Sequence, residues 1–215
     1  MSKKKIYVVG TATHYANWIE NGELTNDMSK ADIVLFTGGC DVDPSLYGRT
    51  KDPSTYSNIE RDEEEKKEYK KAISLKVKLI MGTCRGLQFL NIMHGGLLIQ
   101  DVTHHAISST HGITNGNELY EINSLHHQMV YPFNIDGNKY DILYWAEPWR
   151  SHHYIGITHD EMELVTCEPE IVVYHTNNNT KCLGIQGHPE MLYWRNSYHP
   201  TIDMLNKLVN KYLYD

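Results

Sequence analysis

The amino-acid sequence predicts an α/β protein with a mostly parallel central sheet, flanking helices, and antiparallel hairpins added in the C-terminal half. The first observation is three short apolar segments, KIYVVG (5–10), DIVLFTGG (32–39) and VKLIMG (77–82). Strands that are buried on both faces of a parallel sheet have this composition. The second observation is that a helical segment follows each of the apolar segments 32–39 and 77–82. Strands that alternate with helices are the element order of α/β proteins. The third is a change after Gly96 to short strand-like segments separated by polar turns, which predicts hairpins.

The first two predicted strands both end in glycine. Lys5–Gly10 ends in a single glycine, whereas Asp32–Gly39 runs into a glycine pair that a turn-rich segment, DVDPSLYG, follows. A polar helix is expected next, with Ser57 and Glu60 as a capping box at its start. Its sequence, ERDEEEKKEYKKA, places opposite charges three and four residues apart. This spacing is typical of a solvated helix face, and a binding role for the charged segment is the alternative.

The third strand and the remaining elements are predicted from apolar spacing. After Val77–Gly82, the segment RGLQFLNIMHGG is expected to be a helix that Gly95 ends. Seven later segments resemble short strands: LLIQDV, ELYEI, KYDILYWA, YIGITHD, MELVTCE, EIVVYHT and CLGIQGHPEM. Pro200 suits the first turn of a final helix with one apolar stripe. No repeat or linker separates these elements, so residues 1–215 are expected to form a single domain.

Composition and charge exclude several classes of protein. A chain of 215 residues can bury a sizeable core, and its net charge of −7 argues against nucleic acid or an anionic membrane as the main partner. No apolar segment approaches the roughly 20 residues of a membrane helix. The start, MSKKKIYVVG, is predicted to be a strand and not a signal peptide. The 4 cysteines have no C-x-x-C spacing, which predicts free thiols and a cytoplasmic location.

The segment GTCRG (82–86) places a cysteine between two glycines, directly after a predicted strand and before a predicted helix. In G-x-S-x-G hydrolases this turn exposes a serine nucleophile above the sheet, so Cys84 is the candidate nucleophile. The helix N-terminus favours a thiolate, and the backbone N–H of Arg85 is expected where an oxyanion would form. A small buried cysteine at a tight turn is the alternative.

A thiol nucleophile needs a base and a group that orients the base. GIQGHPEM, near the other end of the chain, supplies His188 and Glu190. In an extended segment, residues two apart have side chains on the same face. Glu190 would then accept a hydrogen bond from one ring nitrogen while the other nitrogen faces Cys84. The prediction therefore requires Cys84 and His188 to meet within hydrogen-bonding distance.

These residues resemble the class I glutamine amidotransferase superfamily, and more closely its γ-glutamyl hydrolase branch, which includes γ-glutamyl-γ-aminobutyrate hydrolase. Four ordered motifs carry the resemblance over most of the chain: FTGGCDVDPSLYG, GTCRGLQFLNIMHGGLLIQD, SLHHQMV and GIQGHPE. Arg85 favours the hydrolase branch, because glutaminase subunits usually have leucine after the nucleophile. The resemblance implies a flavodoxin-like fold of the class I glutaminase type. The chain departs from the family in being compact, with little room for the usual first helix between the first two strands.

The resemblance also implies a reaction and its residues. A triad of Cys84, His188 and Glu190 would hydrolyse γ-glutamyl amides through a glutamyl thioester. Backbone N–H groups would form the oxyanion hole, and three polar side chains would contact the glutamyl group. These residues are Gly39 and Arg85 for the oxyanion hole, and Gln88, His126 and Gln128 for the substrate. No cofactor is implied.

Structural alternatives remain for these side chains. Gln88 could be a helix-surface amide, and Arg85 could hold a structural carboxylate or favour the thiolate. His126 and His127 could be strand residues that face opposite sides of a sheet. No metal site is expected, because adjacent histidines on a strand point apart and the chain has no H-x-H or H-E-x-x-H spacing.

The leading function is a stand-alone hydrolase of small-molecule γ-glutamyl amides. The alternative enzyme is a glutaminase component that delivers ammonia to a separate synthetase subunit, and a third interpretation is a non-catalytic binding domain that retains the fold. The sequence does not identify the amine that leaves in the reaction. Ammonia, an aminobutyrate-type amine, a polyamine and a nucleotide phosphoramidate all fit. Nucleic acid and membranes are not expected as partners. The sequence is compatible with a homodimer.

Overall fold

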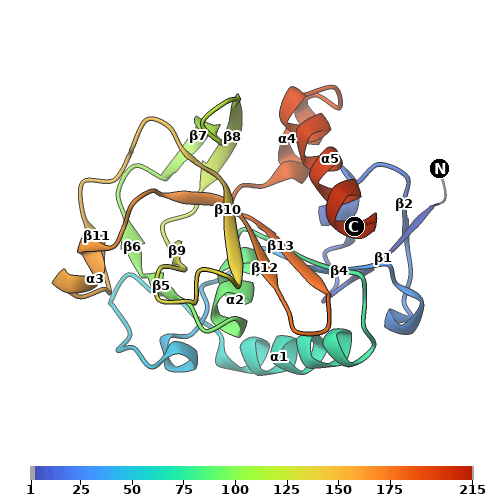
Figure 1. The fold of residues 1–215 in the computed structure, drawn as a ribbon, viewed down its shortest axis with the longest axis horizontal. Coiled ribbons are helices and arrows are strands. Elements are labelled where there is room, and N and C mark those ends of the chain that lie inside the picture. The colour runs from blue at the N-terminus through green and yellow to red at the C-terminus, as the bar shows by residue number, and fades with distance from the viewer. Residues whose placement is uncertain (1–2, 215) are drawn as a thin grey trace.

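The computed structural model describes residues 3–214, in which nine strands form one mixed sheet between layers of helices (Figure 1). One half of the sheet is parallel and consists, in sheet order, of β2 (Gly22–Leu24), β1 (Lys4–Val8), β3 (Ile33–Phe36), β4 (Leu79–Thr83) and β13 (Lys181–Ile185). Antiparallel strands continue it as β12 (Pro169–His175), β10 (Tyr140–Ala146), β7 (Ala106–Thr114) and β8 (Leu119–Leu125). The predicted α/β class is confirmed, with the expected hairpins as the second half of the same sheet.

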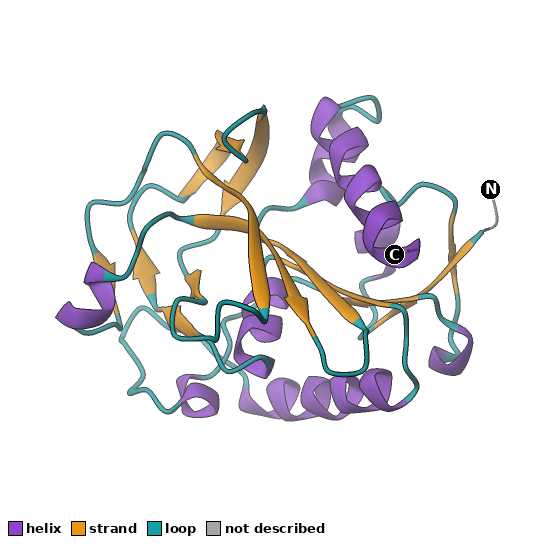
Figure 2. Cartoon of the chain, viewed as in Figure 1, coloured by secondary structure: helices purple, strands orange, loops and turns teal. Residues whose placement is uncertain are grey.

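Helices, turns and two small sheets complete the described part of the chain (Figure 2). The small sheets pair β5 (Leu97–Ile99) with β9 (Met129–Tyr131), and β6 (Asp101–Val102) with β11 (Tyr154–Ile155). The helices are α1 (Ile59–Ser74), α2 (Arg85–Met93), α3 (His159–Glu163), α4 (Pro189–Arg195) and α5 (Pro200–Tyr214). Short 3₁₀ turns are η1 (Thr13–Ala16), η2 (Met28–Lys30) and η3 (Pro44–Tyr47). Among residues 3–214, none of the helices has both the length and the apolar character needed to cross a bilayer.

The sheet separates two hydrophobic cores, because successive side chains of a strand point to opposite faces. On the face covered by α5, Leu35 packs in one cluster with Leu205. On the opposite face, which α1 and α2 cover in Figure 1, Val34 packs in a second cluster with Leu90. The central strands are buried on both faces, which explains why their sequences are continuously apolar.

Two segments differ from the sequence-based expectation. MELVTCE (162–168), predicted as a strand, begins inside α3, because Thr158 and Glu161 form a capping box that starts a helix there. The segment GIQGHPEM is extended only as far as β13, and α4 begins at Pro189. His188 is therefore the N-cap residue of α4 and Glu190 lies in its first turn.

The start of α1 also differs from the prediction. The N-cap residue is Asn58, whose side chain accepts a hydrogen bond from the Arg61 backbone N–H at 3.1 Å. Ser57 is not available as a cap, because its hydroxyl donates to the Asp43 carboxylate at 2.7 Å. Between β1 and β3, the chain forms η1, β2 and η2 in place of an α-helix, as the shortness of this segment indicates.

Three neighbouring parallel strands bring separate parts of the sequence to one edge of the sheet. β3, β4 and β13 are adjacent, so their C-terminal ends lie side by side. The loop after β3 contains Gly38 and Gly39, β4 leads into Cys84, and β13 leads into His188. In parallel α/β sheets, ligands bind at this edge.

Candidate active site

The turn that holds Cys84 explains the glycines on both sides of it. A Cβ atom on Gly82 would lie 2.4 Å from the Gly86 carbonyl carbon, and one on Gly86 would lie 2.3 Å from the Phe36 carbonyl oxygen. Only glycine allows β3, β4 and the start of α2 to approach this closely. Cys84 itself has φ 53° and ψ −109°, a conformation that is strained for a residue with a side chain. Strain of this kind is concentrated at functional sites.

His188 lies between Cys84 and Glu190. Its Nδ1 is 2.7 Å from Glu190 Oε1, and its ring lies close enough to the Cys84 side chain for that side chain to influence its pKa. Burial on its own would lower the pKa of His188, but the hydrogen bonds to Cys84 and Glu190 outweigh burial and raise the pKa to about 10. The structure therefore brings the three predicted triad residues together. The expected extended segment between His188 and Glu190 is not observed, since the start of α4 joins them.

Asn123 of β8 fixes the backbone of His188. The His188 N–H donates to Asn123 Oδ1 at 2.6 Å, and Asn123 Nδ2 donates to the His188 carbonyl at 3.0 Å. Both polar groups of one side chain thus hold the residue that precedes α4. Sequence analysis did not identify Asn123, although it lies three residues before the H-H-Q segment.

Gln186 is a second residue that sequence analysis missed. Its Nε2 donates to the Cys84 sulfur at 3.8 Å, and its side chain is buried. The Cys84 backbone N–H donates to the Ile185 carbonyl at 2.7 Å, so the last residue of β13 and the residue after it both contact the cysteine. A donor aimed at the sulfur stabilises its anionic form.

Tyr15 of η1 lies beside His188, with 5.9 Å between the centroids of the two rings. A Cβ on Gly38 would lie 2.7 Å from the Tyr15 hydroxyl and 3.0 Å from His188 Cε1, so the three residues are in close contact. The pKa of Tyr15 is raised to about 12, first by burial and then by the negative charges of Glu190 and Cys84. The phenol therefore stays neutral over the physiological pH range. Tyr15 lies in the segment where the usual first helix is missing.

The glycine-pair loop is held by Arg61 of α1. Arg61 Nη2 donates to the Gly38 carbonyl at 3.0 Å. Gly39 has φ 137°, and a Cβ there would lie 2.2 Å from Arg61 Nη1, so position 39 requires glycine on both counts. A cavity of about 590 Å³ borders this loop at Thr37 and Gly38, but none of the three triad residues lines it.

The side chain of Arg85 points away from the sulfur. It forms buried ion pairs with Asp62 and Glu65 of α1, which corrects the expectation that the whole charged segment is a solvated face. Of the alternatives for Arg85, the structural carboxylate contact is the one observed. Its backbone N–H belongs to the first residue of α2, a position without a partner inside the helix.

The predicted substrate contacts lie together but are buried. Gln88 Nε2 donates to the Gln128 carbonyl at 3.2 Å, and His126 Nδ1 donates to the same oxygen at 2.8 Å. The His126 side chain then faces Glu170 in the interior, whereas the neighbouring His127 contacts Asp41 at 3.1 Å near the surface. The two histidines thus face opposite directions. A direct substrate contact of His126 remains a prediction, and the observed geometry favours a supporting position.

A mixed α/β sheet with this cysteine-bearing turn at its C-terminal edge defines the glutamine amidotransferase-like class of proteins. The chain belongs to the Peptidase C26 family, whose sequence pattern matches residues 16–190.

Comparisons with individual proteins agree with this assignment. The glutamine amidotransferase-like protein YvdE of Lactococcus lactis subsp. lactis is 33% identical over 134 residues, which are 50% of this chain and 54% of YvdE. Protein NtpR of Enterococcus hirae is 25% identical over 178 residues, which are 79% of this chain and 71% of NtpR. The chain thus spans about half the length of YvdE.

Solved structures show the same fold. A glutamine amidotransferase of Thermotoga maritima superposes with a TM-score of 0.54 at 10% identity, covering 99% of this chain and 95% of that one. A glutamine amidotransferase of Methylobacillus flagellatus gives a TM-score of 0.52 at 11% identity, covering 99% and 92%. At these identities the likeness concerns the fold alone.

Proposed function

We propose that the protein is a cysteine-dependent hydrolase of γ-glutamyl amides. The observation that carries this proposal is the position of His188, whose Nδ1 lies 2.7 Å from Glu190 Oε1 and whose ring interacts with the Cys84 side chain. A nucleophile, a base and a group that orients the base are the parts that thiol hydrolysis requires. Membership of the Peptidase C26 family supports a hydrolytic reaction.

The first half of the reaction forms a thioester. The Cys84 thiolate attacks the γ-carbonyl carbon, and the carbonyl electrons move to oxygen. When the intermediate collapses, the carbon–nitrogen bond breaks and the leaving amine takes a proton from His188. Glu190 keeps Nδ1 of His188 occupied, so that the other nitrogen serves the reaction. The products are a glutamyl thioester on Cys84 and the free amine.

The second half releases glutamate. His188, now neutral, removes a proton from water, and the resulting hydroxide attacks the thioester carbonyl. The carbon–sulfur bond breaks, which restores the thiolate and the protonated His188. In both halves the backbone N–H groups of Arg85 and Gly39 would stabilise the oxyanion, each by about 3 kcal/mol in related acyl transfers. Gln88 and Gln128 would contact the glutamyl group.

The test is a screen of γ-glutamyl amides, including glutamine, with release of glutamate as the readout. Cys84→Ser should lower the release about 10³-fold or more, because loss of the nucleophile removes the covalent route. Cys167→Ser is the matched control, since Cys167 is a partly exposed cysteine distant from the triad in sequence, and it should retain activity. Mass spectrometry should find a glutamine-like diazo-ketone attached to Cys84.

Other outcomes would select other functions. Equal release of glutamate by the protein and Cys84→Ser would rule out Cys84 as the nucleophile. Release from glutamine alone, and only with an added synthetase, would identify a glutaminase component. No release and no labelling of Cys84 would identify a binding domain that retains the fold.

A further inference from the structure

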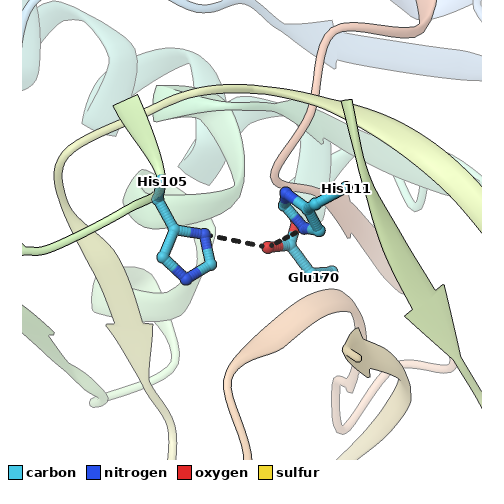
Figure 3. A group of neighbouring side chains, drawn as sticks. All are labelled: His105, His111 and Glu170. Atoms are coloured by element: carbon cyan, nitrogen blue, oxygen red, sulfur yellow. Dashed lines mark ion pairs between the residues drawn. The ribbon is translucent and has the colours of Figure 1, made fainter. Parts of the chain in front are cut away.

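Three histidines and a glutamate from separate strands converge in the interior of the antiparallel half of the sheet. His111 lies on β7 and Glu170 on β12, while His105 precedes β7 and His126 follows β8. Figure 3 shows His105 and His111 directed at the Glu170 carboxylate from two sides. All four side chains are at most 1% exposed.

One carboxylate oxygen is the common point of the cluster. Glu170 Oε1 is 2.9 Å from His111 Nε2, 3.4 Å from His105 Nδ1 and 3.6 Å from His126 Nε2. The approach angles are not those of hydrogen bonds. Within residues 3–214, these three nitrogens and both Glu170 oxygens have no hydrogen-bond partner. Buried polar atoms are nearly always hydrogen-bonded or coordinated, so a set of unpartnered atoms that face one another points to a ligand.

The tautomer of His126 favours a positively charged ligand beside Glu170. Its Nδ1 lies 2.8 Å from the Gln128 carbonyl oxygen, which only accepts, so Nδ1 carries the proton. Nε2 then directs a lone pair at the Glu170 carboxylate. Two lone pairs face each other there, and a cation between them would convert repulsion into coordination.

The spacing and the outer contacts also fit a metal ion. Tetrahedral Zn²⁺ with bonds of about 2.0–2.1 Å separates its ligand atoms by about 3.4 Å, and the three nitrogen–oxygen distances bracket that value. The ligand atoms of His105, His111 and Glu170 all lie within 4.8 Å of one another. Metal-bound histidines usually have an acceptor on their second nitrogen. For His105 the carboxylate on that side is Glu168, 3.4 Å from Nε2.

Glu168 is itself held in place. Its two carboxylate oxygens accept hydrogen bonds from the backbone N–H groups of Arg150 and Ser151, each at 2.8 Å. A fixed carboxylate behind a ligating histidine is the usual outer arrangement of zinc sites. The cluster thus has both the ligand atoms and the supporting groups of a built site.

We propose that His105, His111 and Glu170 bind one Zn²⁺-type dication, with His126 beside the same Glu170 oxygen. The three ligands lie on or directly before β7 and on β12, so the ion would brace these two strands against each other. His126 connects this site to Gln128 and, through its carbonyl, to Gln88. The expectation of no metal site considered only ligands close in sequence, whereas these ligands come together by strand pairing.

A metal-free alternative exists. Burial would lower the pKa of His105, but the nearby carboxylates of Glu168 and Glu170 outweigh burial and raise it to about 9. A protonated His105 would then neutralise Glu170 without an ion. The experiment must therefore separate a bound metal from a bound proton.

The protein should be unfolded and refolded with either excess Zn²⁺ or a chelator, then desalted and analysed for metal by mass spectrometry. We expect about one zinc per chain after refolding with Zn²⁺, and a higher melting temperature than for the chelator-treated protein. Refolding with Co²⁺ should give the visible absorption of tetrahedral cobalt. His111→Asn should reduce the bound metal at least tenfold, whereas His104→Asn, which changes an exposed neighbour of His105, should not.

Metal-free protein from both refolding conditions, with equal melting temperatures, would overturn the proposal and establish the protonated His105 alternative. Equal zinc content of His111→Asn and the unmodified protein would overturn it as well, because the ion would then lie elsewhere. If His111→Asn fails to fold, the zinc content and cobalt spectrum of the unmodified protein decide the question. None of these measurements depends on hydrolytic activity, so the proposed function can fail independently.

Discussion

The imidazole of His188 is held between a sulfur and a carboxylate, and this position determines when it is charged. Its folded pKa of about 10 lies above the ordinary value of 6.5. A group whose pKa rises on folding stabilises the folded state fully below its unfolded pKa. The contribution of His188 is therefore complete below pH 6.5 and is lost as the pH rises through about 10. In the proposed mechanism, the same deprotonation removes the acid that protonates the leaving amine.

This protonation behaviour leads to a prediction for Glu190→Gln. Without the negative charge, the pKa of His188 should fall, because an opposite charge in contact typically shifts a pKa by about 1–3 units. The alkaline limb of the kcat/KM profile should move to lower pH by at least about 1 unit. The measurement is a pH profile of glutamate release, with Glu163→Gln on exposed α3 as the control. An unchanged limb would mean that Glu190 does not control the charge of His188.

Individual residues of the site were predictable to different degrees. Cys84 and Glu190 lie in short motifs whose neighbours in sequence reveal their role. Asn123 and Gln186 were missed because their contacts depend on which strands pair, and nothing adjacent to them in sequence shows it. Tyr15 was missed because it lies in a segment that departs from the family pattern.

At the scale of elements, α1 and α2 are joined by charges and not only by apolar packing. Arg85, at the start of α2, is 1% exposed and contacts the buried carboxylates of Asp62 and Glu65. The guanidinium also lies over the Phe89 ring, 5.8 Å from its centroid. The turn that carries Cys84 is thereby fixed to α1, which covers the same face of the sheet as α2.

Arg85→Leu should destabilise the protein strongly. The substitution leaves two carboxylates buried without a cation, and breaking a buried ion pair from one side costs about 3–5 kcal/mol. Urea denaturation should measure this loss in the free energy of unfolding. The matched control is Glu63→Gln, which removes an exposed pair with Lys66 and should change the free energy by about 1 kcal/mol or less. A loss for Arg85→Leu as small as that of the control would show that the buried charges are solvated.

Prediction of elements succeeded where one physical signal dominated. The parallel strands were recognisable because burial on both faces makes them continuously apolar. β7 was not predicted, because its first four residues are exposed and its apolar side chains do not alternate regularly. At residues 162–168, strand-like apolar residues obscured the capping box of Thr158 and Glu161, which decides the helix α3.

At the scale of the whole molecule, the sheet is stable in its centre and weak at its margins. β3, β4 and β13 are buried on both faces over most of their length, whereas the three residues of β2 at the parallel edge are exposed. Local stability follows the number of buried apolar contacts around a segment.

Hydrogen exchange should therefore be slower in the central strands of the sheet than at its margins. Amides of β4 and β13 should exchange only by global unfolding, and those of β2 and of residues 106–109 should exchange at least about 100-fold faster. Mass spectrometry of peptides after deuterium exchange measures this difference in exchange rate between the strands. Equal protection of β2 and β4 would contradict the expected gradient.

The contact of the Tyr15 phenol with Gly38 and His188 has a consequence for chemical probes. A reagent that approaches the sulfur from this side meets an aromatic ring before it meets the reactive group. Compact electrophiles can pass where branched ones collide, and replacing the ring with alanine should widen the range of inhibitors that react. The selectivity of covalent inhibitors would then report on the shape of one loop near the N-terminus.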